Sequence, residues 1–156
     1  AAVFRELTGL SSSVAAVYIP GRNELVMQRP SALLVRKTLD QVVRHELLHY
    51  AVALSRQKAG VPEERWAGLF WLEESFCTAE CPAGLYDAAR GRKIIDELGD
   101  RKKIKKYLEQ FLRSENERER ADAYASALVF GSALCAKYGK MKIFAAAAGT
   151  ESLGTE

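Results

Sequence analysis

The sequence predicts an α+β fold in which a small N-terminal β-hairpin precedes a mostly helical body. Two β-like runs, VAAVYI (14–19) and ELVMQR (24–29), flank the segment PGRN (20–23), whose residues favour a tight turn. From residue 38 onward, apolar residues recur at the three- and four-residue spacing that is typical of amphipathic helices. We therefore expect a two-stranded sheet near the N-terminus, with helices forming most of the rest of the chain.

The helices are expected at five places. The first should begin just before Leu39, because Thr38 and Gln41 fit a capping box. The segment AGVP (59–62) should end it, and its proline suits the first turn of the next helix. Residues 145–156 are expected to fray. Four further helices are expected, over 63–81, 86–98, 101–114 and 118–138, with Gly99 and Gly139 closing two of them.

Length, composition and charge narrow the class of protein. The 156 residues fit one domain, 1–156, of ordinary globular composition, and no apolar run reaches the roughly 20 residues that span a bilayer. The net charge is only +3, and we expect the basic run RKKIKK (101–106) to be a solvated helix face rather than a phosphate or membrane-surface contact. Nucleic acid is therefore not an expected partner. The three cysteines, an odd number, are too few for a disulfide scaffold.

Both histidines of the chain lie in one segment, VVRHELLHYAV (42–52), where His45, Glu46 and His49 spell H-E-x-x-H. Residues four apart on a helix lie one turn apart on the same face, so each imidazole can direct one nitrogen at a common metal. Glu46 lies about 100° around the helix from His45 and can border the site without being a ligand. A carboxylate in that place can take a proton from a water that zinc has acidified.

Coincidence is the alternative explanation of this segment. Two histidines placed at random in such a chain fall four apart about once in 80 arrangements, and the full pattern arises roughly once in a thousand chains. The segment also lies in a predicted helix with apolar flanks, where two unpaired imidazoles and a carboxylate would be costly to bury. We therefore favour a metal site over a histidine pair satisfied within the core.

The sequence does not supply a third histidine for the metal. Catalytic zinc takes three protein ligands and keeps one position open, so the third ligand must be a carboxylate or a cysteine. The segment WLEESFC (71–77) places Glu73 and Glu74 in an apolar stretch, where two carboxylates need a positive partner. A helix hairpin would bring one of them to the metal, and Cys77 is a further candidate.

These motifs resemble those of the gluzincins, zinc metallopeptidases whose third ligand is a glutamate, and more closely the small bacterial group called peptidase-MA-like. Members of that group read H-E-x-x-H and then W-L-x-E-G about two dozen residues later, and WLEES (71–75) occupies that place here. The pairs Tyr-Ala (124–125) and Tyr-Gly (138–139) match the two ends of a late helix in the group. The resemblance covers about residues 14–145 and departs at Ser75, where glycine is expected.

The resemblance implies a zincin-like body and a Zn²⁺-dependent peptidase that acts on a peptide or protein substrate. It makes Glu46 the general base, and Glu73 and Cys77 stay open as alternatives for the third ligand. Tyr124 is the candidate for stabilising the oxyanion, the alternative being a tyrosine packed in the core. The metal ligands that it implies are His45, His49 and Glu74.

Two further expectations rest on the same resemblance. The strand at 24–29 is expected to offer its edge to an extended peptide. The group slightly favours an extracytoplasmic bacterial location, secreted or associated with the envelope. The alternative function is a catalytically inactive zincin-fold domain that binds peptides or proteins, which the departure at Ser75 makes worth considering.

Overall fold

The computed structural model describes residues 16–19, 21–28, 39–82 and 86–153. Strand β1 (Ala16–Ile19) pairs antiparallel with β2 (Glu24–Met27), and Tyr18 lies opposite Leu25. Asn23 in the turn has a φ of 53°, a left-handed conformation that asparagine tolerates better than most residues. The predicted hairpin and the α+β class are therefore confirmed, while Thr38 of the predicted capping box lies outside the described residues.

The helical body follows the predicted order, with boundaries set by local caps. Helix α3 ends before Gly60, which has a φ of 65°, and α5 begins later than predicted because the Asp87 side chain accepts hydrogen bonds from the N–H groups of Ala89 and Arg90. None of the described helices is both long and apolar enough to cross a bilayer. The helices are α3 (Leu39–Lys58), the 3₁₀ turn η1 (Glu63–Arg65), α4 (Trp66–Glu80), α5 (Ala88–Leu98), α6 (Arg101–Phe111), α7 (Glu117–Tyr138) and α8 (Lys140–Ala147).

The chain end differs from the prediction. Residues 145–148 do not fray, because helix α8 continues to Ala147 and Ala146, Ala147 and Ala148 are buried. Phe144 packs edge-on against Phe76 of α4, with ring centroids 5.9 Å apart. Alanine has the highest helix propensity and lets a helix approach its neighbour closely, so this run docks rather than frays.

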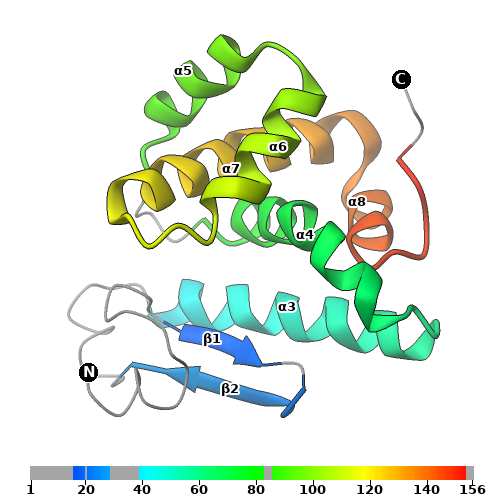
Figure 1. The fold of residues 1–156 in the computed structure, drawn as a ribbon. Coiled ribbons are helices and arrows are strands. Elements are labelled where there is room, and N and C mark those ends of the chain that lie inside the picture. Colours follow the sequence, from blue (N-terminus) through cyan, green and yellow to red (C-terminus); the bar gives the residue numbers. More distant parts are fainter. Residues whose placement is uncertain (1–15, 20, 29–38, 83–85, 154–156) are drawn as a thin grey trace.

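The elements form layers, with α3 between the hairpin and α4 (Figure 1). Beyond α4 lies α7, which also packs against α5, α6 and α8. The basic run 101–106 lies on α6, where Ile104 is buried and lysines at four of the other positions are exposed, as predicted for a solvated face. The H-E-x-x-H helix is thereby enclosed between a strand and a second helix.

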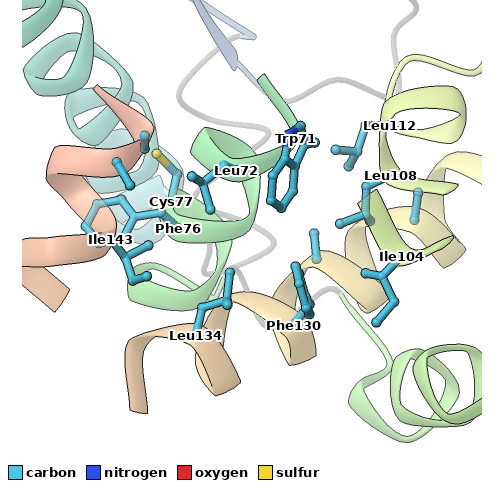
Figure 2. Packing of buried hydrophobic residues seen from close by; sticks show 14 residues of the cluster. Trp71, Leu72, Phe76, Cys77, Ile104, Leu108, Leu112, Phe130, Leu134 and Ile143 are labelled. Atoms are coloured by element: carbon cyan, nitrogen blue, oxygen red, sulfur yellow. The ribbon is translucent and has the colours of Figure 1, made fainter. Parts of the chain in front are cut away.

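The main core lies where α4 meets α7, α6 and α8 (Figure 2). Trp71 of α4 faces Phe130 of α7, with ring centroids 6.1 Å apart. Gly131 allows α7 to pass directly over the backbone of Ser75, because a methyl group at this glycine would overlap the Ser75 carbonyl oxygen. Ser75 itself is fully buried, and its hydroxyl donates to the carbonyl of Trp71. Position 75, where the resemblance leads us to expect glycine, is a serine, and the glycine that lets α4 and α7 approach closely is Gly131 of α7.

Candidate metal centre

Helix α3 carries the H-E-x-x-H residues on two faces. His45 and His49 face α4, because they lie one turn apart on the side of α3 that packs against it. Glu46 points instead toward strand β1. Glu46 and His49 are both 8% exposed, so their side chains are almost entirely shielded from solvent.

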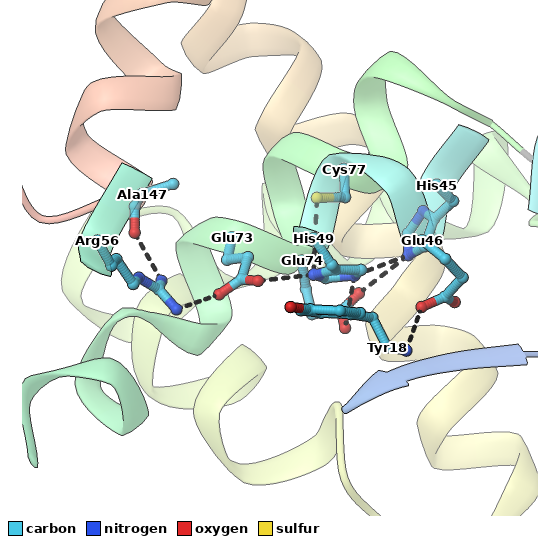
Figure 3. A network of polar contacts seen from close by, with 9 residues as sticks. All are labelled: Tyr18, His45, Glu46, His49, Arg56, Glu73, Glu74, Cys77 and Ala147. Carbon is cyan, nitrogen blue, oxygen red and sulfur yellow. Dashed lines mark hydrogen bonds and ion pairs between the residues drawn. The ribbon is translucent and has the colours of Figure 1, made fainter. Parts of the chain in front are cut away.

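Helix α4 brings Glu74 to the two imidazoles. The Nε2 atoms of His45 and His49 are 3.1 Å apart, and the Glu74 carboxylate straddles them. Its Oε2 lies 3.6 Å from Nε2 of His45, and its Oε1 lies 3.4 Å from Nε2 of His49. All three side chains offer ligand atoms within 4.8 Å of one another (Figure 3). The structure therefore brings together the three residues predicted as ligands.

The spacing of these donors fits a metal ion. Ligand atoms held about 2.0–2.1 Å from a tetrahedral zinc ion lie about 3.3 Å from one another. The separations between the two histidine nitrogens and between each of them and a Glu74 oxygen are 3.1, 3.4 and 3.6 Å, which are close to that value. Oε2 of Glu74 is buried and accepts no hydrogen bond from the described residues, which is costly unless a cation compensates it. Two imidazoles and one carboxylate also match a known catalytic donor set.

Glu73, the neighbouring candidate, contacts the opposite side of His49. Its Oε1 lies 2.7 Å from Nδ1 of His49, on the far side of the ring from Glu74. An ionised carboxylate only accepts hydrogen bonds, so Nδ1 carries the hydrogen and donates it. In a neutral imidazole this leaves the lone pair on Nε2, which points at the proposed metal position. Glu73 thus orients the imidazole of His49 from the side opposite Glu74.

Cys77 lies on the same side of His49 as Glu73. Its Sγ is 3.8 Å from Nδ1 of His49, which is the nitrogen turned away from Glu74. Burial raises the pKa of the Cys77 thiol to about 11, so the thiol stays protonated at neutral pH. Its position beside Nδ1 disfavours Cys77 as the third ligand in this arrangement. Cys81 and Cys135 are also free thiols.

The electrostatics of the cluster favour positive charge between the imidazoles and the carboxylate. Burial lowers the pKa of His49, but the charge of Glu74 and the contacts with Cys77 and Glu73 outweigh it, so the pKa lies well above its ordinary value. Burial raises the pKa of Glu74, yet the charges of His49 and His45 hold that pKa below its ordinary value. A metal cation would bring the same positive charge to the same place.

Strand β1 fixes Glu46. The backbone N–H of Tyr18 donates a 2.7 Å hydrogen bond to Oε2 of Glu46, so the edge of β1 that faces α3 reaches the site. It is therefore β1, rather than the strand at 24–29, that lies beside the H-E-x-x-H helix. Burial and the charge of Glu74 raise the pKa of Glu46. The charges of His49 and His45 and the hydrogen bond from Tyr18 lower it by a smaller amount, so the pKa lies above its ordinary value. A carboxylate with a raised pKa is a better base near neutral pH.

Tyr124 lies on α7 in a pair with Tyr86. Their rings stack with centroids 5.2 Å apart and an interplanar angle of 11°. Burial raises the pKa of both phenols, and the charges of Glu74 and Glu46 raise it further. Both hydroxyl groups therefore keep their protons and can donate. Tyr86 was not predicted, and its place just before α5 carries no helical pattern that would have pointed to it.

Arg56 is the second residue that sequence reasoning missed. It is 3% exposed, and its Nη1 lies 2.7 Å from Oε2 of Glu73. Its Nη2 donates a 2.6 Å hydrogen bond to the carbonyl of Ala147. Arg56 follows His49 by seven residues, two helical turns, so the two side chains share a face. That spacing was the signal available in the sequence.

Comparison with protein-family models, with curated proteins and with solved structures finds no match to this chain. The resemblance to the gluzincins thus rests on the sequence motifs alone, namely H-E-x-x-H, WLEES and the later Tyr-Ala and Tyr-Gly pairs.

Proposed function

We propose that the chain is a Zn²⁺-dependent peptidase of gluzincin type, with His45, His49 and Glu74 as metal ligands and Glu46 as general base. The observation that carries the proposal is the convergence of two imidazole nitrogens and one carboxylate at metal-ligand spacing. The buried Glu46 beside this cluster supplies the base. When bound, zinc would lower the pKa of a water toward about 7 and polarise a substrate carbonyl.

Glu46 performs the proton transfers in this proposal. Its Oε2 is held by the N–H of Tyr18, which leaves Oε1 to accept a proton from the attacking water. The water oxygen bonds to the carbonyl carbon, the C–N bond breaks, and Glu46 returns the proton to the leaving nitrogen. Glu46 must first take a proton from water and then give it to the leaving nitrogen. A carboxylate with a raised pKa takes up the proton more readily near neutral pH, and the acid so formed can then donate it.

A phenol donor is the second part of the proposal. Negative charge develops on the carbonyl oxygen during attack, and hydrogen-bond donors that face it stabilise it. Tyr124 keeps its proton and lies within the electrostatic reach of Glu74 and Glu46. Tyr86, stacked on it, shares these properties, so both phenols are candidates for this donor.

The test is the substitution Glu46→Gln, with zinc content and peptide hydrolysis measured on the same samples. The introduced amide keeps an acceptor oxygen for the Tyr18 N–H but cannot take a proton, so we expect zinc to be retained and hydrolysis to fall by about 10²- to 10⁴-fold. Full activity in this variant would exclude the base role. A zinc-loaded wild type that binds peptides and cleaves nothing across a broad peptide library would instead identify a non-catalytic binding domain.

A further inference from the structure

The metal centre is connected to the C-terminal helix by a continuous line of buried polar contacts (Figure 3). The line runs from the carbonyl of Ala147 through Arg56 and Glu73 to Nδ1 of His49, with links of 2.6, 2.7 and 2.7 Å. Each link is shorter than an ordinary N–H···O hydrogen bond, as is common when charged groups take part. The line joins helices α3, α4 and α8.

Arg56 neutralises Glu73 within the protein. Glu73 is 7% exposed, and a carboxylate buried to that degree needs a positive partner. Arginine is always protonated and its planar guanidinium presents several donors in fixed directions. Because one Glu73 oxygen binds Arg56 and the other binds His49, the guanidinium determines where the carboxylate meets the imidazole.

The far end of the line anchors Arg56. Ala147 is the last residue of α8, where carbonyl groups lack partners within the helix and the helix dipole favours a cation. Gly149, two residues after Ala147, lies close to Leu69 and Val61, because a methyl group added at this glycine would be 2.9 Å from the Leu69 side chain and 3.3 Å from that of Val61. Trp66 adds a contact with the guanidinium, 5.5 Å from the ring centroid. The Ala147 carbonyl and the Trp66 ring therefore hold Arg56 in addition to Glu73.

We propose that Arg56 is a positioning residue of the metal centre, which holds Glu73 so that His49 donates from Nδ1 and presents Nε2 to the metal. This proposal builds on the proposed function, because it assumes that Nε2 of His49 is a ligand atom. Partners of this kind that orient a metal-bound histidine typically change metal affinity by about 10- to 100-fold when they are removed.

The experiment compares Arg56→Met and Arg56→Lys with a matched control, Arg44→Met. Arg44 lies on the same helix but is exposed, and among the described residues it pairs with Asp40, four residues earlier. Zinc affinity is measured by competition with a chelating indicator. We expect Arg56→Met to weaken binding by about 10- to 100-fold, Arg56→Lys to weaken it less, and the control to change it by less than about twofold.

A second measurement separates this proposal from the proposed function. In the metal-free protein, proton NMR follows the Nδ1 proton of His49, which the bond to a buried carboxylate protects from exchange with water. Loss or faster exchange of this signal in Arg56→Met, with the control unchanged, supports the positioning role even if the wild type binds no zinc. Unchanged exchange together with unchanged zinc affinity overturns it. If Arg56→Met fails to fold, the same two readouts on Arg56→Lys decide.

Discussion

Gly131 offers a sharp test of how α7 supports the helix that carries Glu74. The change Gly131→Ala adds a methyl group where the Ser75 carbonyl already lies, and that oxygen belongs to the backbone and cannot rotate away. Overpacking of a core typically costs about 1–3 kcal/mol, and a clash with backbone belongs at the upper end of that range. Alanine offsets about 1 kcal/mol of this because it favours the helix more than glycine does. The expected net loss of stability is about 2 kcal/mol.

The matched control is Gly68→Ala, on the exposed surface of α4. A methyl group there would meet no atom within 4 Å, so only the helix-propensity gain applies. In thermal unfolding of the metal-free protein, a change of this size moves the midpoint by roughly 4–8 °C in a domain of this length. We expect Gly131→Ala to lower the midpoint by that amount and Gly68→Ala to raise it slightly. Equal stabilisation by both substitutions would refute the close packing of α7 on Ser75.

Three further predictions follow from the site. Glu74→Gln should weaken zinc binding by more than about 100-fold in a competition titration. Glu73→Gln should weaken it by at most roughly 10- to 100-fold, which is typical for a residue that orients a ligand. The reverse order of the two effects would make Glu73 the ligand in place of Glu74. At about pH 8, a thiol reagent should modify Cys81 and Cys135 in the folded protein, and Cys77 only after urea unfolding; modification of all three before unfolding would contradict the burial of Cys77. Burial raises the pKa of Cys77 from 9.0 to about 11, so between these pH values the unfolded chain releases a proton that the folded chain keeps. Stability in urea titrations should therefore fall as pH rises through this window, and the fall should be shallower in Cys77→Ala; an equal slope in both proteins would show that the thiol does not contribute.

Local signals were enough to predict most of the fold. Turn residues around Asn23 predicted the hairpin, and glycines after helical runs predicted where α3, α5 and α7 end. Helix α8 was missed because its alanines form no amphipathic stripe. Its order depends on packing against Phe76 and on the bond from Arg56, which are contacts between distant parts of the chain. Propensity alone does not report such contacts.

The candidate site could be predicted only in part from the sequence. Helical spacing alone placed His45 and His49 on one face. The choice between Glu73 and Glu74 was not available from spacing, because adjacent residues differ by about 100° around α4 and both can border α3. The way that α4 lies against α3 separates the two glutamates, because it places Glu74 beside Nε2 and Glu73 beside Nδ1 of His49. The resemblance favoured Glu74 for the first role, and the structure gives Glu73 the second.

Zinc stoichiometry tests the proposed centre most directly. Purified protein, dialysed against zinc and then against metal-free buffer, is analysed by plasma mass spectrometry beside the variant His45→Ala. Two imidazoles and one carboxylate at the observed spacing predict about one zinc ion per chain, lost when a ligand is removed. Wild-type protein without stoichiometric zinc, or a variant that retains it, would contradict a metal centre at His45, His49 and Glu74.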